Sequence, residues 1–218
     1  MNVLCKVYVN FGFSTANYTM KKILVVQSSA RQEGSLSREY ANNLVAQLQA
    51  KYPGSWVVTR DLGAEAVPHL DATLLGGWMK PAEEQTDAEK AASARSDQLV
   101  DELLASDIVV IGSSMYNFGI TSTLKAWFDH VLRAGRTFKY TESGAVGLAG
   151  DRKVYVVTAR GGRYTGTPLD FQEPYVRQLL GFIGITDVEF VNVEGQALGP
   201  EEAAKGRAEA EAALAALA

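Results

Sequence analysis

Three short segments of the chain carry residue types that bind a phosphate group or a flat aromatic ring, and the first is residues 28–37. It holds the hydroxyl groups of Ser29, Ser35 and Ser37 directly before a helical pattern. Unpaired N–H groups and the helix dipole attract anions to a helix N-terminus, and serine hydroxyls add donors. This favours a phosphate monoester. The segment lacks GKS/T and GxGxxG, which counts against triphosphate hydrolysis and Rossmann dinucleotide binding. An ordinary helix start capped by Ser35 is the alternative.

The second segment, residues 114–119, places apolar and aromatic side chains where a surface loop is normally polar. Met115, Tyr116, Asn117 and Phe118 follow the clearest strand pattern in the chain. A flat heteroaromatic ring needs apolar surfaces against its faces and backbone amides at its edge. The segment is therefore interpreted as a ring-binding loop, with simple packing at a helix entry as the alternative.

The third segment, residues 159–164, begins Ala159, Arg160, Gly161 and Gly162. Paired glycines let the backbone approach a ligand closely. Amides placed here would hydrogen-bond the pyrimidine edge of a flavin and stabilise the negative charge that collects there on reduction. A simple turn is the alternative for this segment taken alone.

Strands and helices alternate along the chain and must bring these three segments together. Apolar runs of strand length occur at residues 23–26, 56–59, 107–112, 153–158 and 188–193. Helical patterns occur at residues 36–52, 86–105, 122–134 and 169–182, and a last helix starts near Pro200. This alternation predicts an α/β fold, a flavodoxin-like three-layer sandwich with a five-stranded parallel sheet of order 2-1-3-4-5. The three segments follow strands one, three and four, so they meet beyond the carboxyl ends of the strands.

Three stretches depart from this alternation. Residues 63–85 form a long excursion with a short helix expected at residues 72–75, and residues 138–148 predict a β-excursion around Ser143 and Gly144. Residues 1–19 precede a second methionine, Met20, which stands directly before the first strand. They are interpreted as an extension from an upstream start codon, and a genuine edge strand is the alternative. Residues 20–218 then form one domain.

Composition excludes several classes of protein. The 218 residues are 47% hydrophobic and 21% charged with a net charge of −4, which fits one domain with its own core. An acidic chain lacks the charge of a general nucleic-acid binder. One cysteine and two histidines leave no disulfide and no Cys/His zinc site. The apolar runs are far shorter than the roughly 20 residues of a membrane-spanning helix. We expect a cytoplasmic protein with no metal.

The sequence resembles the FMN-dependent NADH-azoreductase family, the two-electron quinone and azo reductases of the flavodoxin-like superfamily. The resemblance covers nearly everything from Met20 to the C-terminus. It is carried by the motifs KKILVVQSS, MYNFGI, LKAWFDHVLRAGRTFKYTESG, RGG, LLGFIGITDVEFV and EG…GPE. The MYNF loop and GFIGITD are specific to the family, whereas flavodoxins share the serine-rich loop widely.

The resemblance implies a role for each matching position. The FMN phosphate would meet Ser29, Ser35, Leu36 and Ser37, the isoalloxazine ring would lie along Met115, Tyr116, Asn117 and Phe118, and its pyrimidine edge would meet Ala159, Arg160, Gly161 and Gly162. Relatives often have serine at the position of Ala159, which leaves backbone contacts there. Tyr140 and Phe182 would line the substrate side. Phe182 would come from the other subunit of a homodimer with two FMN sites at its interface.

The implied reaction takes place on the cofactor. NADH, or alternatively NADPH, and a quinone or azo compound would take turns at the exposed flavin face, so no protein residue is an indispensable acid or base. Tyr140 is a candidate for orienting or protonating the acceptor. Two other classes remain open, an electron-carrying flavodoxin and a flavin-free interaction protein of the same fold.

Three further residue types attract less specific interpretations. His130 is expected to be a packed or solvated helix residue, and His69 a surface residue. The four-residue spacing of Asp129 and Arg133 predicts a solvated helix ion pair.

Overall fold

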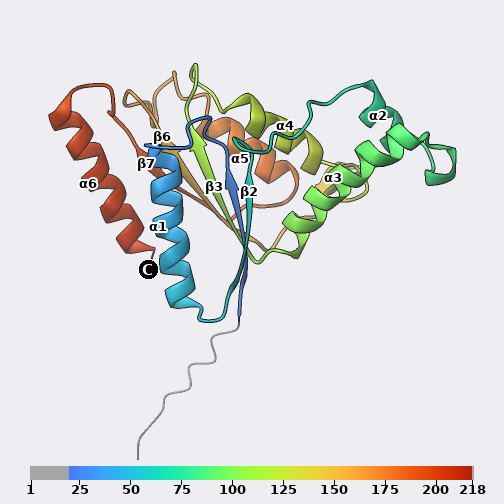
Figure 1. Ribbon diagram of the computed structural model, residues 1–218, viewed down its shortest axis with the longest axis horizontal. Coiled ribbons are helices and arrows are strands. Elements are labelled where there is room, and N and C mark those ends of the chain that lie inside the picture. The colour runs from blue at the N-terminus through green and yellow to red at the C-terminus, as the bar shows by residue number, and fades with distance from the viewer. Residues whose placement is uncertain (1–19, 218) are drawn as a thin grey trace, which may run out of the picture.

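A five-stranded parallel sheet forms the centre of the computed structural model, which describes residues 20–217 (Figure 1). Its strands run in the order β2-β1-β3-β6-β7, and every pairing is parallel. They are β1 (Lys22–Gln27), β2 (Trp56–Asp61), β3 (Ile108–Ser114), β6 (Lys153–Ala159) and β7 (Val188–Val193). Since β6 and β7 are the fourth and fifth strands of this sheet, the predicted order 2-1-3-4-5 is confirmed.

The three inner strands read as continuous apolar runs because helices cover both of their faces. β1, β3 and β6 are buried at nearly every residue, whereas the edge strands β2 and β7 are only partly buried. Alternate residues of β1 enter different cores: Leu24 and Val26 belong to one, and Ile23 and Val25 to the other. This is the pattern of a parallel sheet between two helical layers.

Five helices form the two layers. On one face lie α1 (Leu36–Lys51) and α6 (Pro200–Ala216), which Figure 1 shows side by side. The other face is covered by α3 (Asp87–Ala105), α4 (Ser122–Val131) and α5 (Glu173–Phe182), with Trp127 and Phe128 as large buried side chains. The flavodoxin-like sandwich expected from the sequence is therefore confirmed.

Two helix boundaries differ from the expected ones, and side-chain hydrogen bonds explain both. α4 ends at Val131 because the hydroxyl of Thr137 donates to the Val131 carbonyl (2.6 Å) and accepts from the Arg133 amide (2.9 Å). α5 begins at Glu173 instead of near residue 169. There the carboxylate of Asp170 accepts the amides of Gln172 and Glu173 (3.1 and 3.0 Å).

The excursion over residues 63–85 contains more helix than predicted. It holds α2 (Ala72–Met79) and the short 3₁₀ helix η1 (Ala82–Glu84), and α2 packs against α3. Gly76 and Gly77 look like helix breakers but lie inside α2. A Cβ atom on Gly77 would lie 2.4 Å from Ser93 Oγ and 2.9 Å from the Glu89 carbonyl oxygen. Glycine at this position allows the close approach of the two helices.

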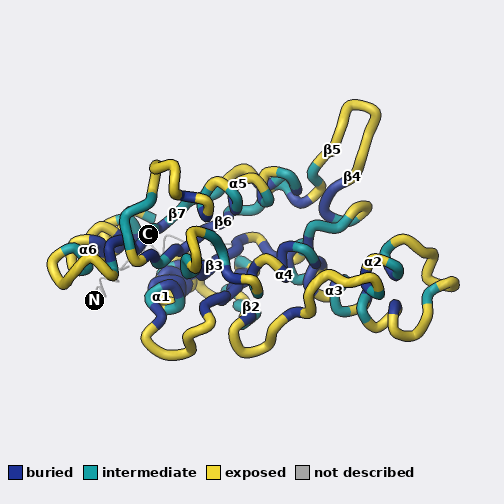
Figure 2. Tube along the Cα trace, turned by 90° about the horizontal axis from the view of Figure 1, so that it is seen from above, coloured by how far each residue is buried: buried dark blue, intermediate teal, exposed yellow. Residues whose placement is uncertain are grey.

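The expected β-excursion is an antiparallel hairpin of β4 (Phe138–Thr141) and β5 (Gly144–Gly147). It projects from the body of the molecule next to α5 (Figure 2). The interpretation of residues 1–19 as an extension lies outside the described residues. Among residues 20–217, no helix is both long enough and apolar enough to cross a bilayer.

Candidate functional site

The three segments singled out in the sequence meet at the carboxyl edge of the sheet. They are called here the first loop (residues 28–37), the second loop (114–119) and the third loop (159–164). All three contribute to one pocket of about 170 Å³. Its lining residues are Ser29, Arg31, Gly34, Ser35, Leu36, Ser114, Tyr116, Ala159, Arg160, Gly161 and Gln196. The predicted convergence is confirmed, because parallel strands that follow one another in this topology end at the same edge.

The first loop offers hydrogen-bond donors at the start of α1. The amides of Leu36, Ser37 and Arg38 have no hydrogen-bond partner among residues 20–217. Ser35 stands at the N-cap position as predicted, but the expectation that its hydroxyl caps the helix is wrong. The hydroxyls of Ser35 and Ser37 lie 3.3 Å apart, and Ser37 reaches the hydroxyl of Ser114 at 2.9 Å. Free amides with hydroxyls beside them suit a phosphate group.

Arg38 holds the first loop in place, a role that sequence reasoning missed. Its guanidinium donates to both carboxylate oxygens of Asp61 at the end of β2 (2.7 and 2.6 Å). It also donates to the carbonyls of Ser29 (2.8 Å) and Arg31 (2.9 Å). The hydrogen bonds from Arg38 lower the pKa of Asp61 below its ordinary value. The sequence held one signal for this ion pair: an arginine in the first turn of the first helix and an aspartate at the end of the following strand.

The second loop is a tight turn with two residues in the left-handed backbone region. Tyr116 and Gly119 exchange two backbone hydrogen bonds of 3.0 Å, and φ is 48° at Asn117 and 67° at Phe118. Asparagine tolerates this region, but for a bulky residue such as phenylalanine it costs about 1–2 kcal/mol. Strain of this kind concentrates at ligand sites. Phe118 is also 46% exposed and meets the ring of Tyr164 edge-on, with centroids 5.9 Å apart.

Met115 fixes the second loop against the third loop, and Asn117 faces a second cavity. The Met115 amide donates to the Ala159 carbonyl (2.9 Å), which ties the second loop to the third. Asn117 and Tyr116 also line a neighbouring cavity of about 500 Å³ with the start of α4. The second loop therefore separates two hollows and presents aromatic surface between them.

The backbone carbonyls of the third loop are hydrogen-bonded to the segment after β7, whereas two of its backbone amides are free within the described chain. The carbonyls of Arg160, Gly161 and Gly162 accept hydrogen bonds from the amides of residues 195–197 at 2.8–3.2 Å. The amides of Gly161 and Gly162 have no partner in the described part of the chain, residues 20–217. A Cβ atom on Gly162 would lie 2.8 Å from the ring of Tyr164, so glycine allows this close packing. Gly161 lines the pocket, and Gly162 follows it directly in the chain; free amides here are the donors that a flavin edge requires.

The side chain of Arg160 does not enter the pocket, so only its backbone is available to a ligand. The guanidinium has no exposed surface and donates to Gln172 (3.0 Å), Asp170 (2.9 Å) and Glu194 (3.2 Å). Burial alone raises the pKa of Glu194, but the amides of Tyr164 and Thr165, together with the charge of Arg160, bring it below its ordinary value. Its Nη1 also donates to the hydroxyl of Thr165 (3.1 Å). Sequence reasoning missed all four partners of Arg160, because no spacing in the sequence pairs side chains across loops and strand ends.

Tyr140 and Phe182 lie together, away from this pocket. Tyr140 is on the hairpin and is 75% exposed, and the rings of both residues contact Phe138 at centroid distances of 5.5 and 4.6 Å. Phe182 ends α5, whose N-cap residue Gln172 is hydrogen-bonded to Arg160 of the third loop (3.0 Å). Ten residues of helix span about 15 Å. The structure therefore does not bring Phe182 to the three loops of its own chain.

Of the remaining predictions from the sequence, those for the two histidines agree with the structure and that for a helix ion pair does not. His130 is buried, as the packed interpretation requires; its Nε2 lies 2.9 Å from the Pro68 carbonyl, and burial lowers its pKa. His69 is exposed as expected. The predicted pair of Asp129 and Arg133 is wrong. Asp129 binds Lys125 (2.5 Å), while Arg133 turns toward α3, where its guanidinium lies 3.4 Å from Asp97 and stacks on Trp78.

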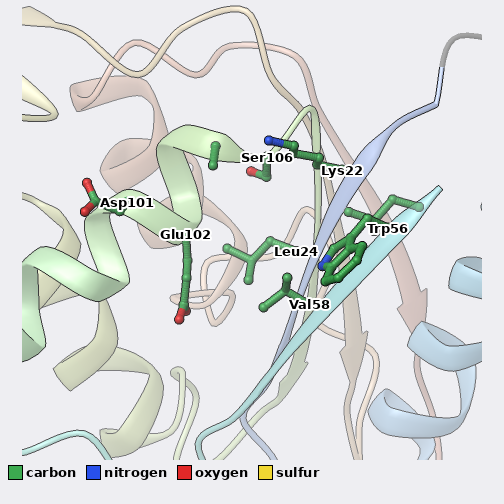
Figure 3. A pocket seen from close by; sticks show the side chains of 9 residues that line it. Lys22, Leu24, Trp56, Val58, Asp101, Glu102 and Ser106 are labelled. Carbon is green, nitrogen blue, oxygen red and sulfur yellow. The ribbon is translucent and has the colours of Figure 1, made fainter.

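A larger cavity of about 350 Å³ lies elsewhere, between the edge strand β2 and helix α3 (Figure 3). Trp56 and Val58 of β2 and Leu24 of β1 form its apolar floor, and Glu102 of α3 stands at its side. None of the residues predicted to bind a cofactor lines it. Among the hollows of the described chain, the pocket between the three loops is therefore the candidate site.

Comparisons with known proteins agree with this fold. A family model for a flavodoxin-like fold matches residues 21–218. The FMN-dependent NADH:quinone oxidoreductase of Azotobacter vinelandii is 57% identical over 196 residues, which is 90% of this chain and 98% of that protein. A protein of Pseudomonas fluorescens named FMN-dependent NADH:quinone oxidoreductase 2 is 53% identical, over 89% of this chain and 98% of its own.

Solved structures show the same architecture. An azoreductase from Bacillus anthracis (strain Sterne) superposes with a TM-score of 0.83 at 33% identity, covering 90% of this chain and 98% of its own. An FMN-dependent NADH-azoreductase from the Ames Ancestor strain, solved in complex with FMN, has a TM-score of 0.81 at 27% identity, covering 91% of this chain and 100% of its own. The chain therefore belongs to the flavodoxin-like family of FMN-dependent NADH:quinone oxidoreductases.

Proposed function

We propose that this chain is an oxidoreductase that uses bound FMN to move two electrons from NADH to quinones and aromatic azo compounds. The observation that carries the proposal is the pocket on which three loops converge, with free amides at α1 and at the third loop. The names of relatives and structural neighbours support the two acceptor classes. Residues 20–218 would form the FMN-binding domain.

Each loop has a part in holding the cofactor. The amides at the start of α1, with Ser29, Ser35, Leu36 and Ser37, would bind the phosphate. Met115, Tyr116, Asn117 and Phe118 would pack along the ring. The backbone of Ala159 and Arg160 and the amides of Gly161 and Gly162 would meet the pyrimidine edge. The fit is chemical: an anion meets unpaired donors, an apolar ring meets exposed aromatic side chains, and carbonyl acceptors meet free amides.

FMN, when bound, supplies the chemistry of taking up and passing on a hydride equivalent. The protein residues bind and orient the reactants, and none is assigned as an essential acid or base. The hydroxyl of Tyr140 is a candidate for orienting the acceptor or giving it a proton. NADPH is the alternative donor.

A homodimer with two FMN sites at its interface belongs to this proposal. Exposed apolar side chains on the hairpin, directly after it and on the segment before α5 support it: Tyr140, Leu148, Leu169 and Phe171. Phe182 lies far from the three loops of its own chain, so a second copy would be needed to bring such a residue to a flavin. The cytoplasmic location expected from composition stays a prediction.

The test is the absorbance spectrum of the purified protein, followed by NADH oxidation with menadione and with methyl red. We expect bound flavin, activity with both acceptors, ping-pong kinetics and a dimeric mass by light scattering. FMN-bound protein that is inert toward both acceptors would contradict the enzyme function. An obligatory ternary complex would contradict the alternating scheme. Parallel assays with NADPH decide the preferred donor.

The two other classes give different results in the same experiment. An electron carrier stores single electrons, so its partial reduction would stop at the one-electron level. Carriers also lack the hairpin after Thr137 and the long segment over residues 63–85, both of which are present here. A flavin-free interaction protein would stay colourless after FMN is added.

A further inference from the structure

A cluster of charged and polar side chains lies buried beneath the third loop, and the proposed reaction uses none of them. At its centre, Arg160 donates from Nη1 to Asp170 (2.9 Å) and Glu194 (3.2 Å) and from Nε to Gln172 (3.0 Å). The Arg160 side chain is 0% exposed, and the two carboxylate side chains are 4% and 10% exposed. Burying three charges is costly even when they are paired. Such an arrangement is expected where it holds a particular backbone conformation.

The cluster joins four segments that surround the pocket. Gln172 donates from Nε2 to the carbonyl and the hydroxyl of Ser113 (3.0 and 2.9 Å), one residue before the second loop. Glu194, one residue beyond β7, accepts the amides of Tyr164 and Thr165 (2.8 and 2.9 Å). Arg160 thus connects the third loop directly to the start of α5 and to the end of β7, and through Gln172 to the end of β3.

These contacts hold the carbonyls and the arginine side chain of the third loop but leave two of its amides without a partner among the described residues. Its carbonyls are tied to residues 195–197 and its arginine is anchored underneath, while the amides of Gly161 and Gly162 have no partner among residues 20–217. We propose that Arg160 is a positioning residue, whose buried guanidinium holds these two amides where the edge of a bound flavin collects negative charge on reduction. This inference rests on the proposed FMN-binding function. Preorganised donors of this kind act through placement.

Two variants and one matched control test the inference. Arg160→Lys keeps the charge but cannot reach Asp170, Glu194 and Gln172 together. Gln172→Met keeps the volume and breaks the link to Ser113, which gives a second route if Arg160→Lys does not fold. Arg152→Lys is the control. Arg152 likewise makes several hydrogen bonds, here to the backbone carbonyls of Leu103 (3.0 Å), Leu104 (2.5 Å) and Gly150 (2.8 Å), but it lies at the opposite end of the sheet.

The first measurement uses the FMN-free protein, so it does not depend on catalysis. We expect Arg160→Lys and Gln172→Met to speed hydrogen exchange of the Tyr164 and Thr165 amides at least tenfold. The second is titration of the same proteins with FMN, in which the dissociation constant rises at least tenfold. The third is the midpoint potential of bound FMN, which becomes more negative because the reduced form loses its placed donors. Arg152→Lys leaves the exchange rates and the dissociation constant within twofold of the parent and leaves the midpoint potential unchanged, whatever it does to thermal stability.

Two results would overturn the inference. One is a folded Arg160→Lys protein with unchanged FMN affinity, midpoint potential and exchange. The other is an equal change in Arg152→Lys, which would make the effect one of general stability. Failure of the proposed function looks different, because the parent protein itself would then bind no FMN or reduce no acceptor.

Discussion

Gly206 lies inside α6, where an alanine would ordinarily stabilise the protein. In the interior of a helix, alanine is favoured over glycine by about 1 kcal/mol. A Cβ atom on Gly206 would lie 2.0 Å from the carbonyl oxygen of Glu194, far inside the 3.4 Å at which ordinary contact begins. That oxygen belongs to the backbone, so it cannot rotate away. We therefore expect Gly206→Ala to destabilise the protein and to reverse the sign given by helix propensity.

The magnitude follows from the two opposing effects. Relieving the contact needs a shift of more than 1 Å between α6 and the end of β7, which loosens the packing of the buried side chains of Ala210 and Leu214. Overpacking of this kind costs up to about 3 kcal/mol. Subtracting about 1 kcal/mol for helix propensity leaves a net loss of about 2 kcal/mol. For a chain of this size the midpoint of thermal unfolding would fall by about 4–8 °C.

Urea unfolding of the FMN-free protein measures this loss, and Gly181→Ala is the matched control. Gly181 lies in α5, and a Cβ atom added to it would have nothing within 4 Å. The same substitution there should leave stability unchanged or raise it by up to about 1 kcal/mol. Because Glu194 also binds the Tyr164 and Thr165 amides, we expect Gly206→Ala to weaken FMN binding as well. A Gly206→Ala protein as stable as its parent would refute the reasoning about helix approach.

Three further predictions follow from single side chains. Ser37→Ala removes the hydroxyl bonded to Ser114 and should raise the FMN dissociation constant about fivefold, a loss of about 1 kcal/mol; fluorescence titration checks this, and an unchanged constant would contradict it. Phe118→Gly should stabilise the FMN-free protein by up to about 1 kcal/mol, since glycine relieves the left-handed strain, while it lowers kcat/KM; a loss of stability in urea would argue against strain. Hydrogen bonding to Lys80 lowers the pKa of Glu89 from 4.5 to about 2, so its contribution is present above pH 4.5 and is lost as the pH falls toward 2. Glu89→Gln should therefore be less stable than the parent at pH 7 and equal to it near pH 2, and a gap that is constant with pH would exclude the carboxylate.

Local patterns were enough to predict the sheet and its order. The apolar runs of β1, β3 and β6 are long, continuous and bounded by polar residues, and burial on both faces is the physical reason for that pattern. Strict alternation with helices then leaves few topologies. The segment over residues 63–85 is harder to predict. Gly76 and Gly77 look like helix breakers in the sequence, and their role in the contact between α2 and α3 is visible only once the two helices are packed.

The candidate site could likewise be predicted only in part. The contributions of the first, second and third loops could be predicted, because parallel strands end at one edge and loops that follow them meet there. The partners of Arg160 and of Arg133 could not. Asp170 and Glu194 are 10 and 34 residues from Arg160, and Asp97 lies on a different helix from Arg133.

The sequence by itself therefore determined the class of fold, the order of the strands and the three loops that gather at the carboxyl edge. These features depend on periodic burial and on chain connectivity, both of which can be read locally. Only the tertiary structure decided which charges are buried together, which glycines allow helices to touch, and that Phe182 lies far from the loops of its own chain. Such features depend on distances between elements that are remote in sequence, and these distances exist only once the layers have packed.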